Sequence, residues 1–300
     1  NVLAVAVNIT VVLPTHAGWL RAWGTGAPEG DSSLVNFAPG QVVPNSAVLR
    51  PGRNGALTVK LFTPTGPAAA DIVIDIFGWF SSSGYVSNGG SYGARLIPTT
   101  PGPGRIFDSR NSNTPLGASD QREIQIWGAD AADPAITDIV PNSSNVVGVM
   151  LNITAVNNLP GSASTFFSLT PSPTPAGSEP ATSNMNVAPG RFRSNLAIVP
   201  VSADGKVYLY NLAGSAHAIL DVVGYLIANQ SPTTRQGRVV PLVAPFRVFD
   251  TRQPEFFETP LPPANAEDWS FTAFVNDVKV GTEPVGNQVG LLGNLTAANL

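Results

Sequence analysis

The chain contains no cysteine in its 300 residues. Disulfide bonds, thiolate metal ligands and cysteine nucleophiles are therefore excluded, and stability must come from packing and backbone pairing. Charged residues make up only 12% of the chain, and the formal net charge is -4. Because no basic cluster is present either, nucleic acid and anionic membrane surfaces are not expected as partners.

Long apolar runs are also missing. The apolar stretch from Ile72 to Phe80 is short and is interrupted by Asp75, whereas a membrane-spanning helix needs roughly 20 apolar residues. We therefore expect no membrane insertion. The chain begins at Asn1 without a signal-peptide pattern, which predicts a processed chain or a fragment.

Turn-forming residues, by contrast, are abundant. The chain has 29 glycines and 28 prolines, together with many Asn, Ser and Thr residues. This composition is typical of a turn-rich all-β protein with few helices.

One stretch of the chain occurs twice, once at residues 184–226 and once at residues 35–80. The matched positions are Asn36, Pro39, Gly40, Asn45, Gly55, Asp75 and Gly78 in the first copy, and Asn186, Pro189, Gly190, Asn195, Gly205, Asp221 and Gly224 in the second. A fixed internal repeat of this kind outweighs any local prediction and indicates repeated modules.

Each copy contains two turn signals. Pro39-Gly40 and Pro189-Gly190 suit a type II turn, in which glycine takes the positive φ. Asn54-Gly55 and Asp204-Gly205 lie between apolar runs, which predicts a β-hairpin at each. The last strand, His217 to Leu226, is apolar on both alternating faces and is predicted to be a central, well-covered strand.

A second repeated strand sets the module length. It carries Asn8-Ile9-Thr10, then Asn152-Ile153-Thr154, then Asn294-Leu295-Thr296, and the asparagine numbers differ by 144 and then by 142. Arg-x-x-Asp-[Ser/Thr]-Arg occurs twice, with Arg105, Asp108, Ser109 and Arg110 in one copy and Arg247, Asp250, Thr251 and Arg252 in the other.

These repeats divide the chain into modules. Residues 94–226 are one complete module, residues 1–80 are the back part of a module, and residues 238–300 are the front part of another, with linkers at residues 81–93 and 227–237. We predict that each module is an antiparallel β-sandwich of about eight to ten short strands. A closed β-barrel is the alternative.

The arginine motif and the repeated aspartate are predicted to form ion pairs. Asp221 lies in a strand that is apolar on both faces, and a buried carboxylate needs hydrogen bonds and a compensating charge. We expect Arg105 or Arg110 to supply that charge. By the same logic Asp75 should meet Arg247 or Arg252, either within a longer tandem chain or in a neighbouring molecule that adds a strand at an open sheet edge.

Taken together, these motifs resemble a known kind of protein. The arginine motif, Asn-[Ile/Leu]-Thr, Asp-Gly-x-Val-x-Leu-Tyr-Asn and Asp-Val-Val-Gly-Tyr are similar to the tandem β repeats of large secreted surface proteins of actinobacteria and Chloroflexi-type bacteria. The resemblance implies an extracellular structural or adhesive role without catalytic residues. The first copy has Lys60-Leu61-Phe62 where we align Tyr208-Leu209-Tyr210 of the second, so a shared ligand site is not expected there.

Three further patterns have a functional and a structural interpretation. Residues 89–93 match the Gly-x-Ser-x-Gly nucleophile motif but lie in a linker, and the two histidines, His16 and His217, occupy unmatched positions, so we predict no enzyme. Acidic residues that suggest a calcium loop are Glu123, Asp130, Asp133 and Asp138, but their spacing fits no EF-hand-like template. A solvated loop is preferred, and no metal or cofactor is predicted.

The third pattern concerns glycans. Asn8, Asn152 and Asn294 each begin an Asn-x-Thr sequon and are possible glycan acceptors. Hydrogen bonding between same-face side chains inside the sandwich explains them without a glycan and is the preferred interpretation. Aromatic residues available for sugar stacking are Trp19, Trp23, Trp79, Trp127 and Trp269, for which core or interface packing is the commoner use.

Two functions from different classes follow. The first is an extracellular structural or adhesive repeat protein, a building block of a surface filament, sheath or stalk that contacts copies of itself head-to-tail or as tandem modules. The alternative is a carbohydrate-binding repeat region of a secreted bacterial enzyme, with cell-surface polysaccharide as the partner.

Overall fold

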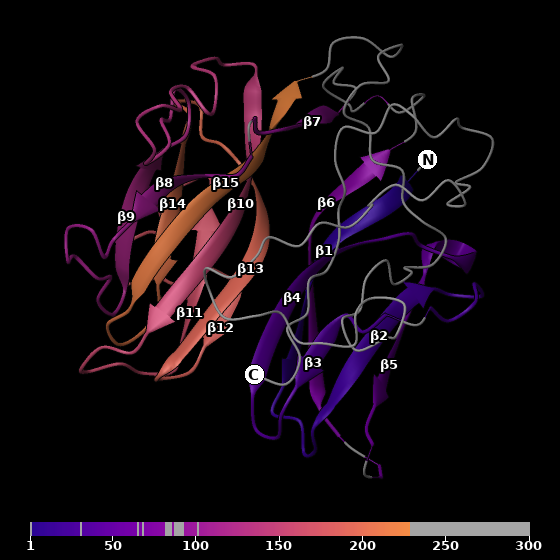
Figure 1. Ribbon diagram of the computed structural model, residues 1–300. Coiled ribbons are helices and arrows are strands. Elements are labelled where there is room, and N and C mark those ends of the chain that lie inside the picture. The colour runs from indigo at the N-terminus through magenta and orange to yellow at the C-terminus, as the bar shows by residue number, and fades with distance from the viewer. Residues whose placement is uncertain are drawn as a thin grey trace, which may run out of the picture.

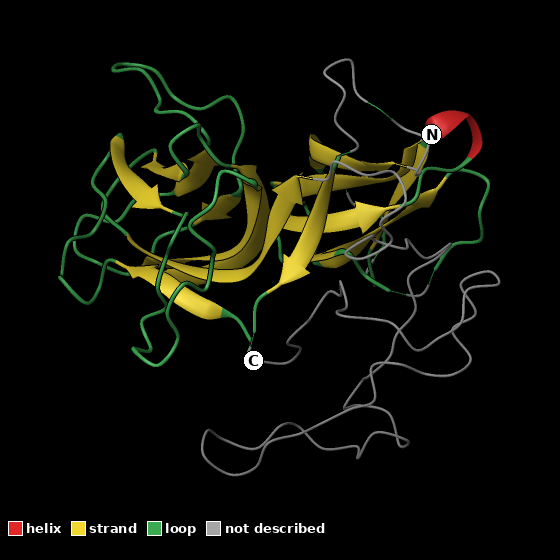
Figure 2. Cartoon of the chain, turned by 90° about the horizontal axis from the view of Figure 1, so that it is seen from above, coloured by secondary structure: helices red, strands yellow, loops and turns green. Residues whose placement is uncertain are grey.

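The computed structural model describes residues 2–228, except residues 31, 65, 68, 82–85, 87–92 and 101. Within these ranges the regular structure is antiparallel β-sheet, with one short 3-10 turn, η1, at Arg53–Gly55 (Figure 2). The all-β prediction is confirmed. The predictions for Arg247, Asp250, Arg252, Asn294 and Trp269, and for a front part at residues 238–300, concern residues outside the described ranges.

The N-terminal part of the chain forms a two-layer sandwich (Figure 1). One sheet has the order β4-β1-β6 and the other has the order β3-β2-β5. Alternating apolar side chains of both sheets, including Val7, Ile9, Leu20 and Val35, fill the core between the layers. The strands are β1 (Val2–Val12), β2 (Gly18–Gly24), β3 (Val35–Phe37), β4 (Val42–Leu49), β5 (Leu57–Phe62) and β6 (Asp71–Ser81).

The following part of the chain repeats this sandwich and enlarges it. One sheet has the order β13-β10-β15-β7, with β8 also paired to β15, and the other has the order β12-β11-β14-β9. Strand β15 is central, as predicted. The strands are β7 (Ala94–Pro98), β8 (Gly104–Asp108), β9 (Asp120–Gln125), β10 (Val146–Asn157), β11 (Thr165–Thr170), β12 (Met185–Val187), β13 (Arg191–Pro200), β14 (Lys206–Asn211) and β15 (His217–Ala228).

The matched residues form equivalent turns and hydrogen bonds in both sandwiches. Gly40 has φ 70° and Gly190 has φ 71°, and a turn hydrogen bond spans each Pro-Gly pair, so the predicted type II turns are present. Nδ2 of Asn45 donates to the Leu34 carbonyl and Nδ2 of Asn195 donates to the Asn184 carbonyl, each at 2.6 Å. These asparagines fix the same loop in each module.

The hairpin prediction was wrong. Asn54-Gly55 and Asp204-Gly205 do form tight turns, with φ of 57° and 72° in the first and 76° at Gly205. However, β4 and β5 belong to different sheets, and so do β13 and β14. The two strands that flank each turn lie in opposite layers, and both bury their apolar faces in the core between the layers. The chain therefore crosses from one layer to the other at the turn and does not form a hairpin.

The strand register also corrects the alignment around Lys60. Strands β2 and β11 correspond because the matched residues Asn36 and Asn186 lie opposite equivalent positions in them. Counted from those anchors, Lys60 corresponds to Tyr210 and Leu61 to Asn211. Residues 60–62 therefore correspond to residues 210–212 and not to residues 208–210.

The two sandwiches differ most at their last strand. In the second, side chains from residues 116–140, including Ile126, cover the core side of β15, and Leu220 and Val222 are fully buried. In the first, β6 pairs with β1 and, among the described residues, has no strand on its other edge. The aligned Ile74 and Ile76 are 41% and 65% exposed.

A polar junction joins the two sandwiches, which lie side by side in both views (Figures 1 and 2). Asn8 on β1 is 1% exposed; its Nδ2 donates to the Ser183 carbonyl at 2.9 Å, and its Oδ1 accepts from Nδ2 of Asn195 at 2.9 Å. Oδ1 of Asn195 accepts the backbone N–H of Ser46 on β4 at 2.9 Å. The face of β1 and β4 therefore rests against the β12–β13 edge of the next sandwich.

Candidate functional site

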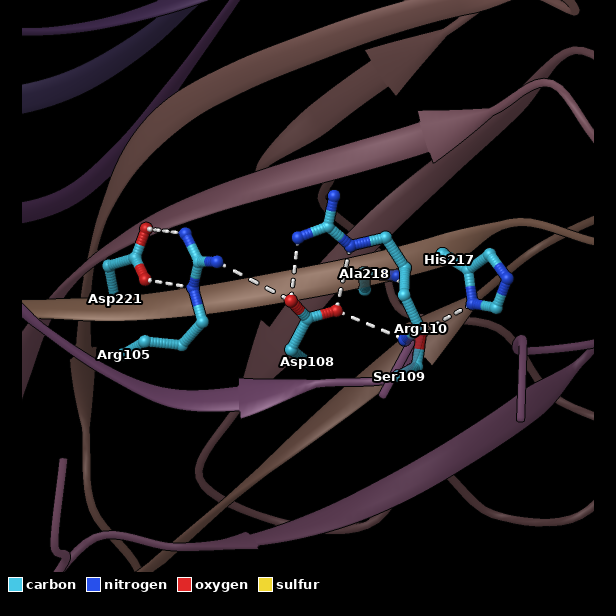
Figure 3. Close-up of polar contacts among 7 residues, drawn as sticks. All are labelled: Arg105, Asp108, Ser109, Arg110, His217, Ala218 and Asp221. Carbon is cyan, nitrogen blue, oxygen red and sulfur yellow. Dashed lines mark hydrogen bonds and ion pairs between the residues drawn. The ribbon is translucent and has the colours of Figure 1, made fainter. Parts of the chain in front are cut away.

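The arginine motif and the repeated aspartate meet on the outer face of the β8–β15 pair (Figure 3). Arg105 donates through Nε to Oδ1 of Asp221 at 2.8 Å and through Nη2 to Oδ2 at 3.4 Å. Its Nη1 also donates to Oδ2 of Asp108 at 3.4 Å. Of the two predicted partners for Asp221, the structure selects Arg105.

Asp108 is the most enclosed member of this cluster, with a side chain 3% exposed. Its Oδ1 accepts the backbone N–H of Arg110 at 3.0 Å and Nε of Arg110 at 2.9 Å, and its Oδ2 accepts Nη2 of Arg110 at 2.7 Å. These hydrogen bonds from Arg110 lower the pKa of the Asp108 carboxyl. Asp108 therefore stays ionised and holds both arginines of the motif.

A bulge brings Arg105 and Asp108 to the same face. Residues three apart on a regular strand point to opposite faces, because side chains alternate. Here Phe107 lies opposite Leu220 and Arg105 lies opposite Asp221. Between these two pairs β8 has one residue more than β15, which is a β-bulge. The spacing Arg-x-x-Asp is thus the spacing that a bulged strand requires.

A second contact in this cluster was not among the predictions. Oγ of Ser109 lies 2.9 Å from Nδ1 of His217 and accepts the backbone N–H of Ala218 at 3.0 Å. The hydroxyl and the imidazole nitrogen share one hydrogen bond, whose direction is set by the histidine tautomer. Ser109 is 1% exposed, so its hydroxyl anchors the end of β8 to the start of β15 and offers no open face to a substrate.

A signal for this contact was present in the sequence. Ser109 lies four residues after Arg105, and His217 lies four residues before Asp221. In an antiparallel pair with Arg105 opposite Asp221, those spacings bring Ser109 close to His217. His217 has no matching histidine in the first copy, where Asp71 takes its place, so the repeat alone does not mark it.

Asp75 has no such cluster around it. It is aligned with Asp221 and lies opposite Asn8 on β1, and it makes no ion pair within the described residues. Burial raises the pKa of its carboxyl.

The acidic residues considered for calcium act in turns. Oδ1 of Asp130 accepts the backbone N–H of Asp138 at 2.8 Å, and Oδ1 of Asp133 accepts that of Ala135 at 3.0 Å. Glu123 pairs with Lys206 on the neighbouring strand. In the described part of the chain, no three acidic or histidine side chains are grouped so that they could hold a metal ion.

The sequon asparagines have unequal environments. Asn8 is buried in the junction, where its amide nitrogen is already a donor, so a glycan there would break the contact between the sandwiches. Its amide bonds to Ser183 and Asn195 of the neighbouring sandwich, and Oγ of Ser46 in its own module also donates to its Oδ1 at 3.5 Å. The expectation of bonding inside its own module therefore covers only part of its contacts. Asn152 is half-buried.

The tryptophans that the structure describes do not form one platform. Trp127 packs against the core and donates from Nε1 to the Val146 carbonyl at 2.8 Å. Trp19 stacks on Phe62 with ring centroids 5.6 Å apart, whereas Trp79 on β6 is 55% exposed. A hollow of about 440 Å³ is lined by residues 24–27 and 50–53, none of them aromatic.

The described residues form two β-sandwiches in tandem, and in the second an arginine strand is ion-paired to the central strand. No protein-family model matches the chain, and no curated protein matches it in sequence. Within the described residues, no helix has the length and apolarity needed to cross a membrane.

Proposed function

We propose that the protein is an extracellular structural or adhesive repeat protein, a building block of a surface filament, sheath or stalk. The observation that carries this proposal is the polar junction between the two sandwiches. Its contacts use different surfaces on the two partners: the face around Asn8 on one side and the edge around Asn195 on the other. Such a contact is head-to-tail and can continue from module to module.

Both modules carry the key residue of each surface. Asn152 of the second module is the counterpart of Asn8, and Asn45 of the first is the counterpart of Asn195. A module with both surfaces is able to join one neighbour on each side. This is the property that a linear array requires.

The ion-pair cluster supports the same role. Its carboxylates and guanidinium groups bond to one another, and Asp108 and Ser109 are enclosed. Groups that satisfy one another in this way hold strands together and leave no unpaired charge to act on a substrate. The cluster therefore serves as a clamp between the front and back parts of a module.

The carbohydrate-binding alternative has one observation in its favour, the outer face of β2 and β5. Trp19 and Phe62 stack there, and Arg21 and Lys60 each lie 4.6 Å from the Phe62 ring. The second module has Phe166 and Tyr210 near the corresponding place, with centroids 6.3 Å apart.

A polysaccharide pull-down separates the two functions. If the chain is a structural building block, the purified protein is expected to stay in the unbound fraction when insoluble bacterial cell-wall polysaccharide is pelleted. The paired variant Trp19→Ala/Phe62→Ala is expected to behave like the wild type. The exposed substitution Phe192→Ala serves as the matched control. Saturable retention that is lost in the paired variant and kept in the control would favour the carbohydrate-binding function.

A further inference from the structure

We propose that the edge of β6 away from β1, which has no partner strand among the described residues, is a strand-binding site for residues 247–252 of a second copy of the chain. The bound segment takes the register that β8 takes on β15. This inference rests on the proposed structural function and names the contact through which copies are joined.

The first support is the unfinished core beside β6. Val73, Ile74 and Ile76 are 47%, 41% and 65% exposed, whereas their counterparts on β15 are at most 4% exposed. In the second module that burial comes from β8 and from residues 116–140, which belong to the front part. A front part is therefore the kind of segment that fits this edge, and exposed edge strands with apolar faces readily accept another strand.

The second support is charge. Strand β6 carries Asp71 and Asp75 at the positions of His217 and Asp221, and neither makes an ion pair among the described residues. The register of β8 on β15 would set Arg247 opposite Asp75, as Arg105 is set opposite Asp221. It would also set the hydroxyl of Thr251 beside Asp71, the counterpart of His217, so that the carboxylate accepts the hydroxyl hydrogen.

The third support is the order of motifs in the occupant. Residues 238–300 repeat the start Arg-x-x-Pro, the arginine motif and the Asn-x-Thr strand in the order in which they occur from residue 95 to residue 154. The segment therefore carries the parts that complete the second module. Bound to β6 of another copy, it makes a head-to-tail contact that propagates.

The absence of cysteine makes this register directly testable. The double variant I74C/F249C places thiols at positions that correspond to Leu220 and Phe107, which are paired in the second module. On oxidation with oxidised glutathione, we expect disulfide-linked dimers and a ladder of higher multimers on non-reducing gels. The control V147C/F249C keeps the cysteine at position 249 and places the second cysteine at an exposed position on β10 instead of on β6. This control is expected to remain monomeric.

A charge swap gives an independent measurement by sedimentation velocity. Asp75→Lys is expected to weaken self-association by about 30-fold or more, and D75K/R247E is expected to restore it to within about tenfold of the wild type. Circular dichroism of each variant checks that the fold is kept.

Three outcomes would overturn the inference. Equal cross-linking in both cysteine variants, or no cross-linking in either, would show that residue 249 does not meet β6. A disulfide confined to a single chain would show that the occupant is not a second copy. If the wild-type chain forms filaments while I74C/F249C fails to cross-link, the structural function stands and this contact alone is wrong.

Discussion

Residues 94–228 expressed alone are expected to unfold in a single cooperative transition, whereas residues 1–80 alone are expected to show none. The larger fragment contains a continuous core that includes Leu116, Ile126 and Leu220, and its central strand is paired on both edges. The smaller fragment leaves one edge of β6 unpaired, with Ile76 65% exposed. Small domains depend on burying most of their apolar surface, so an unfinished core leaves little net stability.

Thermal unfolding followed by circular dichroism and calorimetry tests both fragments. Residues 1–228 serve as the control, because that chain keeps the junction between the sandwiches. A sharp transition for residues 1–80, or none for residues 94–228, would contradict the division into a complete module and the back part of another.

Asp221→Ala is expected to lower the free energy of unfolding by about 1 to 3 kcal/mol, because it removes two charge-assisted hydrogen bonds from Arg105. The cost is below the roughly 3 to 5 kcal/mol of a fully buried broken pair, since the side chains of Asp221 and Arg105 are 19% and 39% exposed. Asp221 is thus less buried than the sequence predicts.

Asp75→Ala is the matched control, with the same substitution at the aligned position. Burial raises the pKa of Asp75 in the folded chain above its unfolded value, so its ionised form costs stability at neutral pH, and this cost disappears as the pH falls below the unfolded pKa. The substitution is therefore expected to leave stability unchanged or to raise it slightly. Urea unfolding at pH 7, at concentrations too low for self-association, measures both variants, and equal losses would refute the pairing of Asp221 with Arg105.

Much of the fold was predictable because the repeat constrains it. Matched turns at Gly40 and Gly190, the central strand at residues 217–226 and the pairing of Asp221 with the arginine motif all follow from residues that recur. Only local chemistry was needed for these: positive φ at glycine, apolar character on both faces of a strand, and charge compensation.

The errors arose where a contact lies between layers or between modules. The sequence predicts the turn at Asn54-Gly55, but it does not predict the sheet to which each flanking strand belongs. A strand in either sheet can bury its apolar face in the same core. The burial of Asn8 depends on a neighbouring sandwich, and the contact of Ser109 with His217 depends on a register that only the folded pair defines.

Electron microscopy of the purified 300-residue chain over a range of concentrations tests the structural function most directly. The account predicts linear particles one module wide that lengthen with concentration, with a repeat that matches the stacking of the two sandwiches. Particles that stay single at every concentration, with the 31.2 kDa mass of one chain, would contradict it.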